Sequence, residues 1–167
     1  MLLVSSGLGL LTAAGEEQTA PASTSPSAAK IDQLLADSGY KFVKKTDSVW
    51  YIPSHGKSLG DYRVILAAQD DLLVTFVTVV KKARLPLTTE FVLRVLKFNN
   101  SFDFVKVGLD RDGDLFVRCD SSVRILDVKE LKAVVEQVSA STNEVYEEVL
   151  PSLISDSGVS SNSPAPS

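Results

Sequence analysis

The sequence has very few of the side chains that usually carry chemistry. One cysteine, Cys119, and one histidine, His55, occur among 167 residues. A single cysteine excludes an internal disulfide and a zinc site built from several thiolates. No nucleophile elbow, phosphate-binding loop or dinucleotide fingerprint occurs either. We therefore predict no catalytic residue, no metal ligand and no cofactor, and a protein that is not an enzyme.

Long runs of one charge and long apolar runs are also missing. The 17 Lys and Arg residues against 21 Asp and Glu residues give a formal net charge of -4. No basic run is long enough to follow a phosphate backbone, so nucleic acid is not an expected partner. No uncharged apolar run reaches the length of a spanning helix, so we expect no membrane span.

The first residues form a candidate signal peptide. An apolar stretch from Leu2 to Leu11 is followed by the small residues Thr12 and Ala14, as in the second half of a secretory signal. The usual Lys or Arg at the start is missing. We expect an exported protein, periplasmic or secreted, if Met1–Ala14 is a signal peptide, and a cytoplasmic one otherwise.

Composition divides the rest of the chain into three parts. Residues 15–27 and 154–167 are rich in Ala, Ser, Thr and Pro, with too little apolar surface to offset chain entropy. We predict a flexible linker over 15–27, a disordered tail over 154–167 and one folded domain over 28–153.

The first half of this domain predicts one helix and four strands. Ile31, Leu34 and Leu35 recur at helical spacing before Gly39, which suits a left-handed helix end. FVKK and VWYIP form a hairpin, and YRVILAA and LLVTFVTVV follow as two more strands. LLVTFVTVV is apolar on both faces, so we expect a central strand with Phe76 in the core.

The second half predicts a helix, a hairpin and a long final helix. Phe91, Val92, Val95 and Leu96 share one helical face, and the helix should end near Asn99 and Asn100. Asp127 caps a final helix whose valines recur at helical spacing until Pro151. The order α-β-β-β-β-α-β-β-α favours an α+β fold with an antiparallel sheet.

The stretch VGLDRDGDLFVRCD has aspartates at the spacing of a calcium loop. Asp110, Asp112 and Asp114 match the first three ligand positions, but Leu115 replaces the required glycine and Ser121 the bidentate glutamate. An Asp-Gly pair between two apolar runs is typical of a hairpin turn. We interpret the stretch as a turn.

Four other features have both a functional and a structural interpretation. His55 could act as a base only with Asp61 beside it, and a solvated loop histidine is the alternative. Cys119 fits a small core residue, and Trp50 fits sheet packing. Six cations either protect strand edges or form a patch for an anionic partner: Lys41, Lys44, Lys45, Lys81, Lys82 and Arg84.

One succession of segments runs through the domain: SGYKF, VWYIP, YRVILAA, LLVTFVTVV, LRVLKFNN and FDFVKVGLDRDGDLFVRCD, followed by a helix with Tyr146. This succession resembles the YbjN-like family of bacterial proteins. These proteins are often labelled sensory transduction regulators, and their fold is similar to that of type III secretion chaperones. The resemblance covers about Ala28 to Leu153. It implies a compact domain that binds proteins, commonly as a dimer, without catalytic residues.

We therefore predict a non-catalytic protein-binding module, chaperone-like or regulatory, that binds a protein partner through sheet edges or a helix face. The alternative is a small-molecule carrier that binds an apolar ligand between sheet and helices. An uncharacterised hydrolase is a third hypothesis. The small residues Ser139–Thr142 in the final helix should cover the sheet poorly, which favours a second subunit and a homodimer. The alternative is a monomer whose core is completed by the first helix and the Phe91–Phe98 helix.

Overall fold

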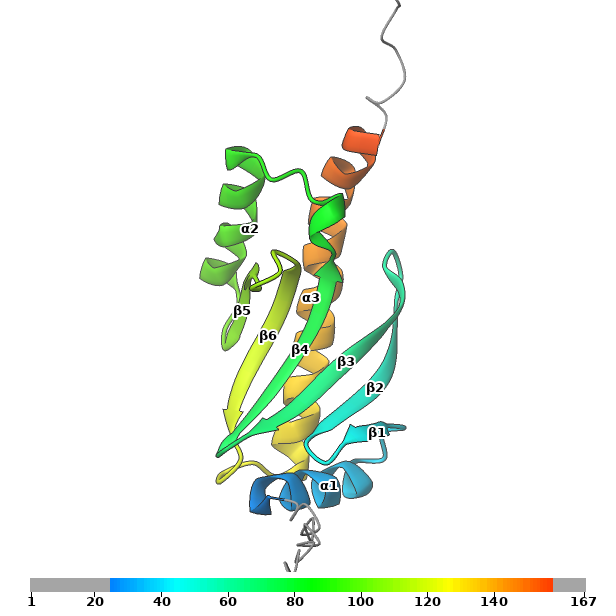
Figure 1. Ribbon diagram of the computed structural model, residues 1–167, viewed down its shortest axis with the longest axis vertical. Coiled ribbons are helices and arrows are strands. Elements are labelled where there is room, and N and C mark those ends of the chain that lie inside the picture. The colour runs from blue at the N-terminus through cyan, green and yellow to red at the C-terminus, as the bar shows by residue number, and fades with distance from the viewer. Residues whose placement is uncertain (1–24, 158–167) are drawn as a thin grey trace, which may run out of the picture.

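Six antiparallel strands form one sheet in the computed structural model, which describes residues 25–157 (Figure 1). The strands are β1 (Val43–Thr46), β2 (Val49–Gly56), β3 (Gly60–Gln69), β4 (Leu72–Val80), β5 (Val105–Leu109) and β6 (Leu115–Ser122). The helices are α1 (Pro26–Ser38), α2 (Thr89–Ser101) and α3 (Val128–Ser157), with a short 3-10 turn, η1 (Lys82–Arg84). The predicted order of elements and the α+β fold are confirmed.

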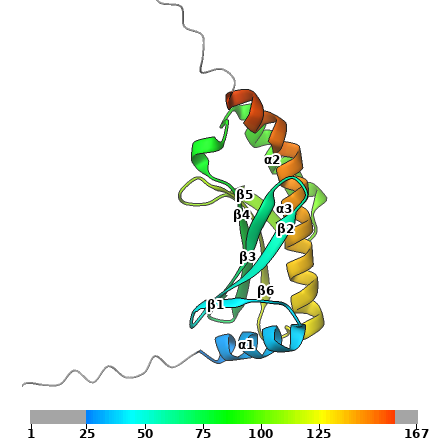
Figure 2. The ribbon, with the colours of Figure 1, turned by 90° about the vertical axis from the view of Figure 1, so that its right-hand side faces the viewer.

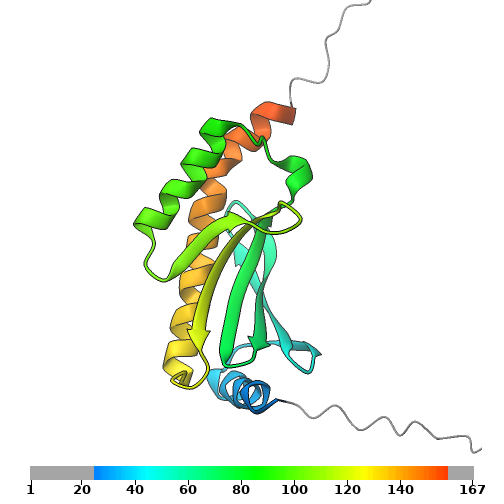
Figure 3. The same ribbon diagram turned by 60° about the vertical axis from the view of Figure 1, so that its left-hand side comes forward.

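The helices leave one face of the sheet uncovered. The strand order is β1-β2-β3-β4-β6-β5, and α3 runs along one face (Figure 2). α1 lies across the lower end of the sheet, and α2 lies beside the upper part of α3, next to β5 (Figure 3). We call the side of the sheet away from α3 the open face.

The core lies between the sheet and α3. Leu73 and Val77 of β4 and Val117 of β6 are almost fully buried there, as are five valines of α3 between Val134 and Val149. β4 lies between β3 and β6, so the expected central strand is confirmed. The expectation that Phe76 lies in the core was wrong. Side chains alternate along a strand, and Phe76 points to the open face, where it is partly exposed.

The small residues of α3 are packed against the sheet. Ser141 is 5% exposed and Thr142 is fully buried, with its hydroxyl donating to the Val138 carbonyl at 2.7 Å. A Cβ added to Gly56 of β2 would lie 2.0 Å from Asn143 Oδ1, so helix and hairpin approach closely. The expectation that this part of the helix covers the sheet poorly was therefore wrong.

Both ends of the described chain extend past the expected domain limits. α1 is capped by Ser25, whose hydroxyl accepts from the Ala28 N–H at 3.2 Å, and Pro26 suits the first helical turn. α3 continues through Pro151 to Ser157, because Leu153 still packs in the core. The candidate signal peptide and most of the expected linker and tail lie outside the described residues. Within 25–157, no helix is long and apolar enough to cross a membrane.

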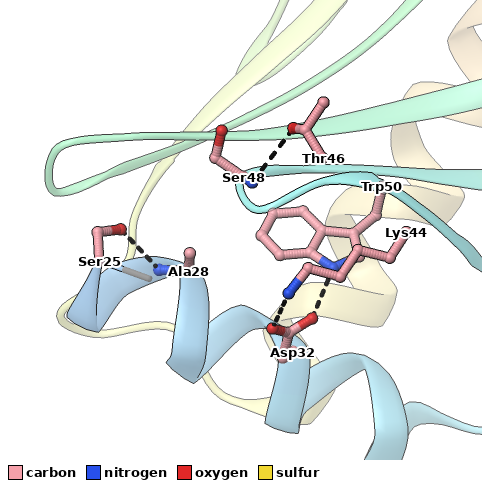
Figure 4. Close-up of polar contacts among 7 residues, drawn as sticks. All are labelled: Ser25, Ala28, Asp32, Lys44, Thr46, Ser48 and Trp50. Atoms are coloured by element: carbon pink, nitrogen blue, oxygen red, sulfur yellow. Dashed lines mark hydrogen bonds and ion pairs between the residues drawn. The ribbon is translucent and has the colours of Figure 1, made fainter. Parts of the chain in front are cut away.

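A buried tryptophan attaches α1 to the sheet (Figure 4). Trp50 of β2 is fully buried, and its indole N–H donates to Asp32 of α1 at 2.7 Å. The same carboxylate forms an ion pair with Lys44 of β1. Gly39 then ends α1 with a φ of 77°, as its position predicts. Trp50 was expected to be half-buried in the sheet, and it is instead fully buried between the sheet and α1.

The side chain of Asn99 occupies the outer edge of β5. Its Oδ1 accepts from the Val107 N–H at 2.8 Å, and its Nδ2 donates to the Val107 carbonyl at 2.9 Å. An amide with this geometry takes the place of a neighbouring strand at that residue. α2 ends at Ser101, so the expectation that the helix ends near Asn99 and Asn100 is confirmed.

We expect Asp32→Ala to lower the free energy of unfolding by about 1–3 kcal/mol, because it leaves the buried indole N–H of Trp50 without an acceptor. The cost should shrink in a Trp50→Phe background, where no N–H is present. Urea denaturation of the four proteins measures both effects. Asp37→Ala, an exposed change on the same helix, serves as control. An equal cost in both backgrounds would contradict the assigned hydrogen bond.

We expect Asn99→Ala to lower the free energy of unfolding by about 1–3 kcal/mol and to promote self-association, since Val107 loses two hydrogen bonds at a strand edge. Denaturation and sedimentation velocity at several concentrations test the two effects. Asn100→Ala is the matched control, because Asn100 is exposed on the same helix. Identical behaviour of the two variants would show that Asn99 does not protect this edge.

Candidate interaction surface

One row of side chains crosses the open face through all six strands. Their neighbours along each strand, such as Trp50, Leu66 and Val77, point into the core. The row itself therefore points away from α3. From β1 to β5 it consists of Val43, Tyr51, Ile65, Phe76, Arg118 and Lys106. Its middle is apolar and aromatic, and its β5 end is cationic.

Two hollows lie along this row. One, of about 490 Å³, is lined by Val43, Tyr51 and Arg63 among others. The other, of about 270 Å³, is lined by Val74, Phe76 and Phe116 among others. Aromatic side chains on a concave surface provide contact area at low cost in side-chain entropy. The open face can therefore accommodate the side chains of a partner.

Tyr51 lies between two cations. The Lys45 ammonium is 5.5 Å from the centre of the ring, and the Arg63 guanidinium is 5.7 Å from it. Both distances are within the range of a cation–π interaction. Among residues 25–157, neither Lys45 nor Arg63 forms an ion pair with a carboxylate. Their charges are thus available to a partner.

At the other end of the row the charges are largely neutralised. Asp120 accepts from Arg118 Nε at 2.6 Å and from Lys106 Nζ at 3.0 Å. Burial alone would raise the pKa of Asp120, but the hydrogen bonds from Arg118 and Lys106 outweigh it, so the pKa lies below its ordinary value. Asp120 is therefore ionised and bound to both cations at neutral pH.

Two other apolar patches lie outside the open face. Leu93 and Leu96 on α2 are 56% and 52% exposed, so the expectation that Leu96 shares one face with the buried Phe91 and Val95 was wrong. Phe104 before β5 and Ile125 before α3 are 84% and 76% exposed. Each patch is confined to one or two short segments, whereas the open face is continuous over neighbouring strands. The open face is the more extensive surface for a protein partner.

The aspartates of the candidate calcium loop hold a turn together. Asp110 Oδ1 accepts from the backbone N–H groups of Asp112 and Asp114 at 3.0 and 2.9 Å. Asp114 accepts from Lys81 Nζ at 2.6 Å and from the Lys82 N–H at 2.8 Å. Within the described residues, no group of three His, Cys, Asp or Glu side chains could hold a metal ion. The interpretation of this stretch as a hairpin turn agrees with these bonds.

His55 and Asp61 come together, but in solvent. His55 Nδ1 lies 2.7 Å from Asp61 Oδ1 across the β2–β3 hairpin, and the two side chains are 72% and 95% exposed. A catalytic base needs its partner held in a shielded site, which this hairpin does not offer. Cys119 is buried in the core, and burial raises the pKa of its thiol, so it is a poor nucleophile.

The six cations singled out from the sequence do not form one patch. Lys44 pairs with Asp32 and Lys81 with Asp114, whereas Lys45 lies on Tyr51. Arg63 was not grouped with Lys45 from the sequence, because the two residues lie on β1 and β3, which do not pair directly. The antiparallel pairing of VWYIP with YRVILAA could have placed Arg63 near Tyr51, because it puts Pro53 opposite Arg63 and Tyr51 opposite Ile65.

The bonds of Asp114 make stability dependent on pH. The hydrogen bond from Lys81, with that from the Lys82 backbone, lowers the pKa of the Asp114 carboxyl below its ordinary 3.8. A lowered pKa in the folded state stabilises the fold above pH 3.8, and this contribution is lost as the pH falls through the lowered value.

We expect Asp114→Asn to unfold at lower urea concentration than the parent at pH 7, because the charged acceptor of Lys81 is lost. The difference should decrease as the pH falls below 3.8. Urea midpoints of both proteins between pH 7 and pH 3 measure it, with the exposed Asp112→Asn as control. A difference that persists unchanged at the lowest pH would contradict a role for the ionised carboxyl.

Comparison with known proteins identifies a family. The model of the YbjN family, described as "Putative bacterial sensory transduction regulator", matches residues 27–151. No protein of curated function matches the chain.

Solved structures share the fold at low sequence identity. Escherichia coli YbjN is 16% identical with a TM-score of 0.56, and the match covers 75% of this chain and 92% of that one. A chain of the HopA1–SchA chaperone–effector complex is 13% identical with a TM-score of 0.56, over 72% and 96% of the two chains. A chain of the complex of the Yersinia pestis type III secretion chaperone SycH with a fragment of YscM2 is 13% identical with a TM-score of 0.50, over 71% and 98%. The fold is that of these chaperones, and the family match, which extends over most of the chain, shows that this protein belongs to the YbjN family.

Proposed function

We propose that this protein is a non-catalytic protein-binding module that holds an extended segment of a partner protein on the open face. The observation that carries the proposal is the row through Tyr51, Ile65 and Phe76, which runs across the sheet away from α3. Aromatic and aliphatic side chains in a continuous surface row are typical of protein interfaces.

The geometry suits an extended segment. The open face is broad and shallow, with hollows of about 490 and 270 Å³ at separate points along it. An extended chain places alternate side chains on one side, so successive apolar residues can enter separate hollows. The relatives SycH and HopA1–SchA were solved with protein partners, which supports a protein-binding role in this fold.

The same features favour binding over catalysis or carriage of a small molecule. The His55–Asp61 pair lies in solvent, and the only cysteine of the chain is buried. An apolar ligand between sheet and helix would have to displace Val77 and Val138, which are at most 1% exposed and pack in one core. No observation on residues 25–157 favours the carrier hypothesis.

A homodimer stays a prediction, but the surface expected to form it is now α2 and no longer the middle of α3. The middle of α3 is covered by its own sheet, so it does not need a second subunit. The surface best suited to a second copy is α2, where Leu93 and Leu96 are more than half exposed. Such a contact would leave the open face available to an unlike partner, because α2 lies on the α3 side of the sheet (Figure 3).

A photo-reactive side chain tests the proposed function. We expect benzoylphenylalanine in place of Phe76 to cross-link to discrete protein partners in the native host on irradiation, since Phe76 lies in the middle of the row. The same residue in place of Glu144, which is exposed on α3, should give little cross-linking. Gel electrophoresis and mass spectrometry of the purified adducts identify the products.

Folding of both proteins is checked by circular dichroism and denaturation. Adducts that are equally abundant and identical at the two positions would mean nonspecific contact. Absence of any adduct at Phe76 in the folded protein would contradict binding on the open face.

A further inference from the structure

We propose that the partner segment is acidic as well as apolar, and that its Asp or Glu side chains bind to Lys45 and Arg63 beside Tyr51. We call these three residues the Tyr51 cluster. The proposal rests on the proposed function, because the same segment would place its apolar side chains on Ile65 and Phe76. The occupant is thus an extended peptide of a partner protein with alternating or adjacent carboxylates and apolar groups.

The Tyr51 cluster comes from three neighbouring strands. Lys45 lies in the irregular part of β1, Tyr51 in β2 and Arg63 in β3. Both cations are within 6 Å of one aromatic ring, which limits their range of positions. A cation on an aromatic ring keeps its hydrogen-bond donors free at the edge, so it can bind a carboxylate as well.

The two cations of the cluster have no carboxylate of their own. Asp61 lines the same hollow, but it is hydrogen-bonded to His55. Asp120 is held by Arg118 and Lys106 at the other end of the row. The cluster is therefore the part of the open face where positive charge is left without an ion pair among the described residues.

The local charge is opposite to that of the whole chain. Four Lys or Arg side chains lie on the open face, at Lys45, Arg63, Lys106 and Arg118, against the carboxylates of Asp61 and Asp120 and that of Asp110, which lines the hollow beside Phe76. The complete chain has a net charge of -4. A basic patch on an acidic protein attracts an acidic segment to this face and repels it from the others.

The apolar row beside the cluster distinguishes a peptide from a nucleic acid. A phosphate backbone is bound by many cations along a track, and the cluster offers two. Ile65 lies directly opposite Tyr51 in the register, and Phe76 opposite Ile65. A carboxylate bound to the cluster thus has an apolar surface next to it, where neighbouring aliphatic or aromatic side chains of the same peptide can bind.

Selection from a library of random 12-residue peptides displayed on phage tests the proposal with the full chain. We expect the parent to enrich peptides that combine Asp or Glu with apolar residues. One enriched peptide is then synthesised with a fluorophore, together with a copy in which Asn and Gln replace Asp and Glu. Fluorescence anisotropy measures the binding of both peptides.

The double variant Lys45→Gln/Arg63→Gln should bind the acidic peptide about tenfold more weakly, the difference expected from losing charged hydrogen bonds. The amide peptide should bind parent and variant alike. Lys97→Gln/Lys129→Gln, two exposed lysines of α2 and α3, is the control with the same change of net charge and should bind like the parent.

The possible outcomes separate the two proposals. Enriched peptides without acidic residues, or an acidic peptide that binds the double variant as tightly as the parent, would overturn the role of the Tyr51 cluster and leave the proposed function standing. Peptides that bind Phe76→Ser as tightly as the parent would overturn binding on the open face itself. No enrichment at all by the folded parent would overturn both.

Discussion

The packing of α3 along one face of the sheet is the contact on which the rest of the structure depends. A helix of 30 residues is about 45 Å long, enough to cross the whole sheet, and its valines are buried along most of that length. Small and hydroxyl side chains at Ser141 and Thr142 allow helix and strands to approach closely. Since α1 lies at the end of the sheet and α2 beside α3, none of the three α-helices of the described residues covers the opposite face (Figure 2).

The two edges of the sheet are better protected than its open face. At the β5 edge, Asn99 satisfies both backbone groups of Val107. At the other edge, β1 is only four residues long, irregular and carries two lysines. Short, irregular or charged edges resist the addition of a further strand. A partner would therefore bind to side chains on the open face more readily than to free backbone groups at an edge. Binding of this kind differs from strand addition, in which a partner strand pairs with the edge of a sheet.

Much of the fold could be predicted because its signals are local. Gly39, the Asp127 cap and the two-sided apolar run of β4 each specify an element without reference to the rest of the chain. Phe76 and Leu96 were placed wrongly because β4 and α2 carry apolar residues on more than one face. Only tertiary packing decides which of those faces is covered. The Tyr51 cluster could not be predicted, since it joins three strands through two hairpins whose register and twist were unknown. Lys45 was noted from the sequence, but its companions were not.

The distribution of charge has a consequence for the kinetics of encounter. The outer side of α3 exposes Glu130, Glu136, Glu144, Glu147 and Glu148 against Lys129 and Lys132, whereas the open face is basic. The opposite charges of α3 and the Tyr51 cluster contribute a component of an electric dipole directed through the thickness of the sheet. In the field of a charged partner such a dipole favours orientations in which the open face points toward the partner. This raises the association rate without strengthening the final complex. Because mobile ions screen this field over about 8–10 Å, the rate of association should respond to ionic strength more than the rate of dissociation does.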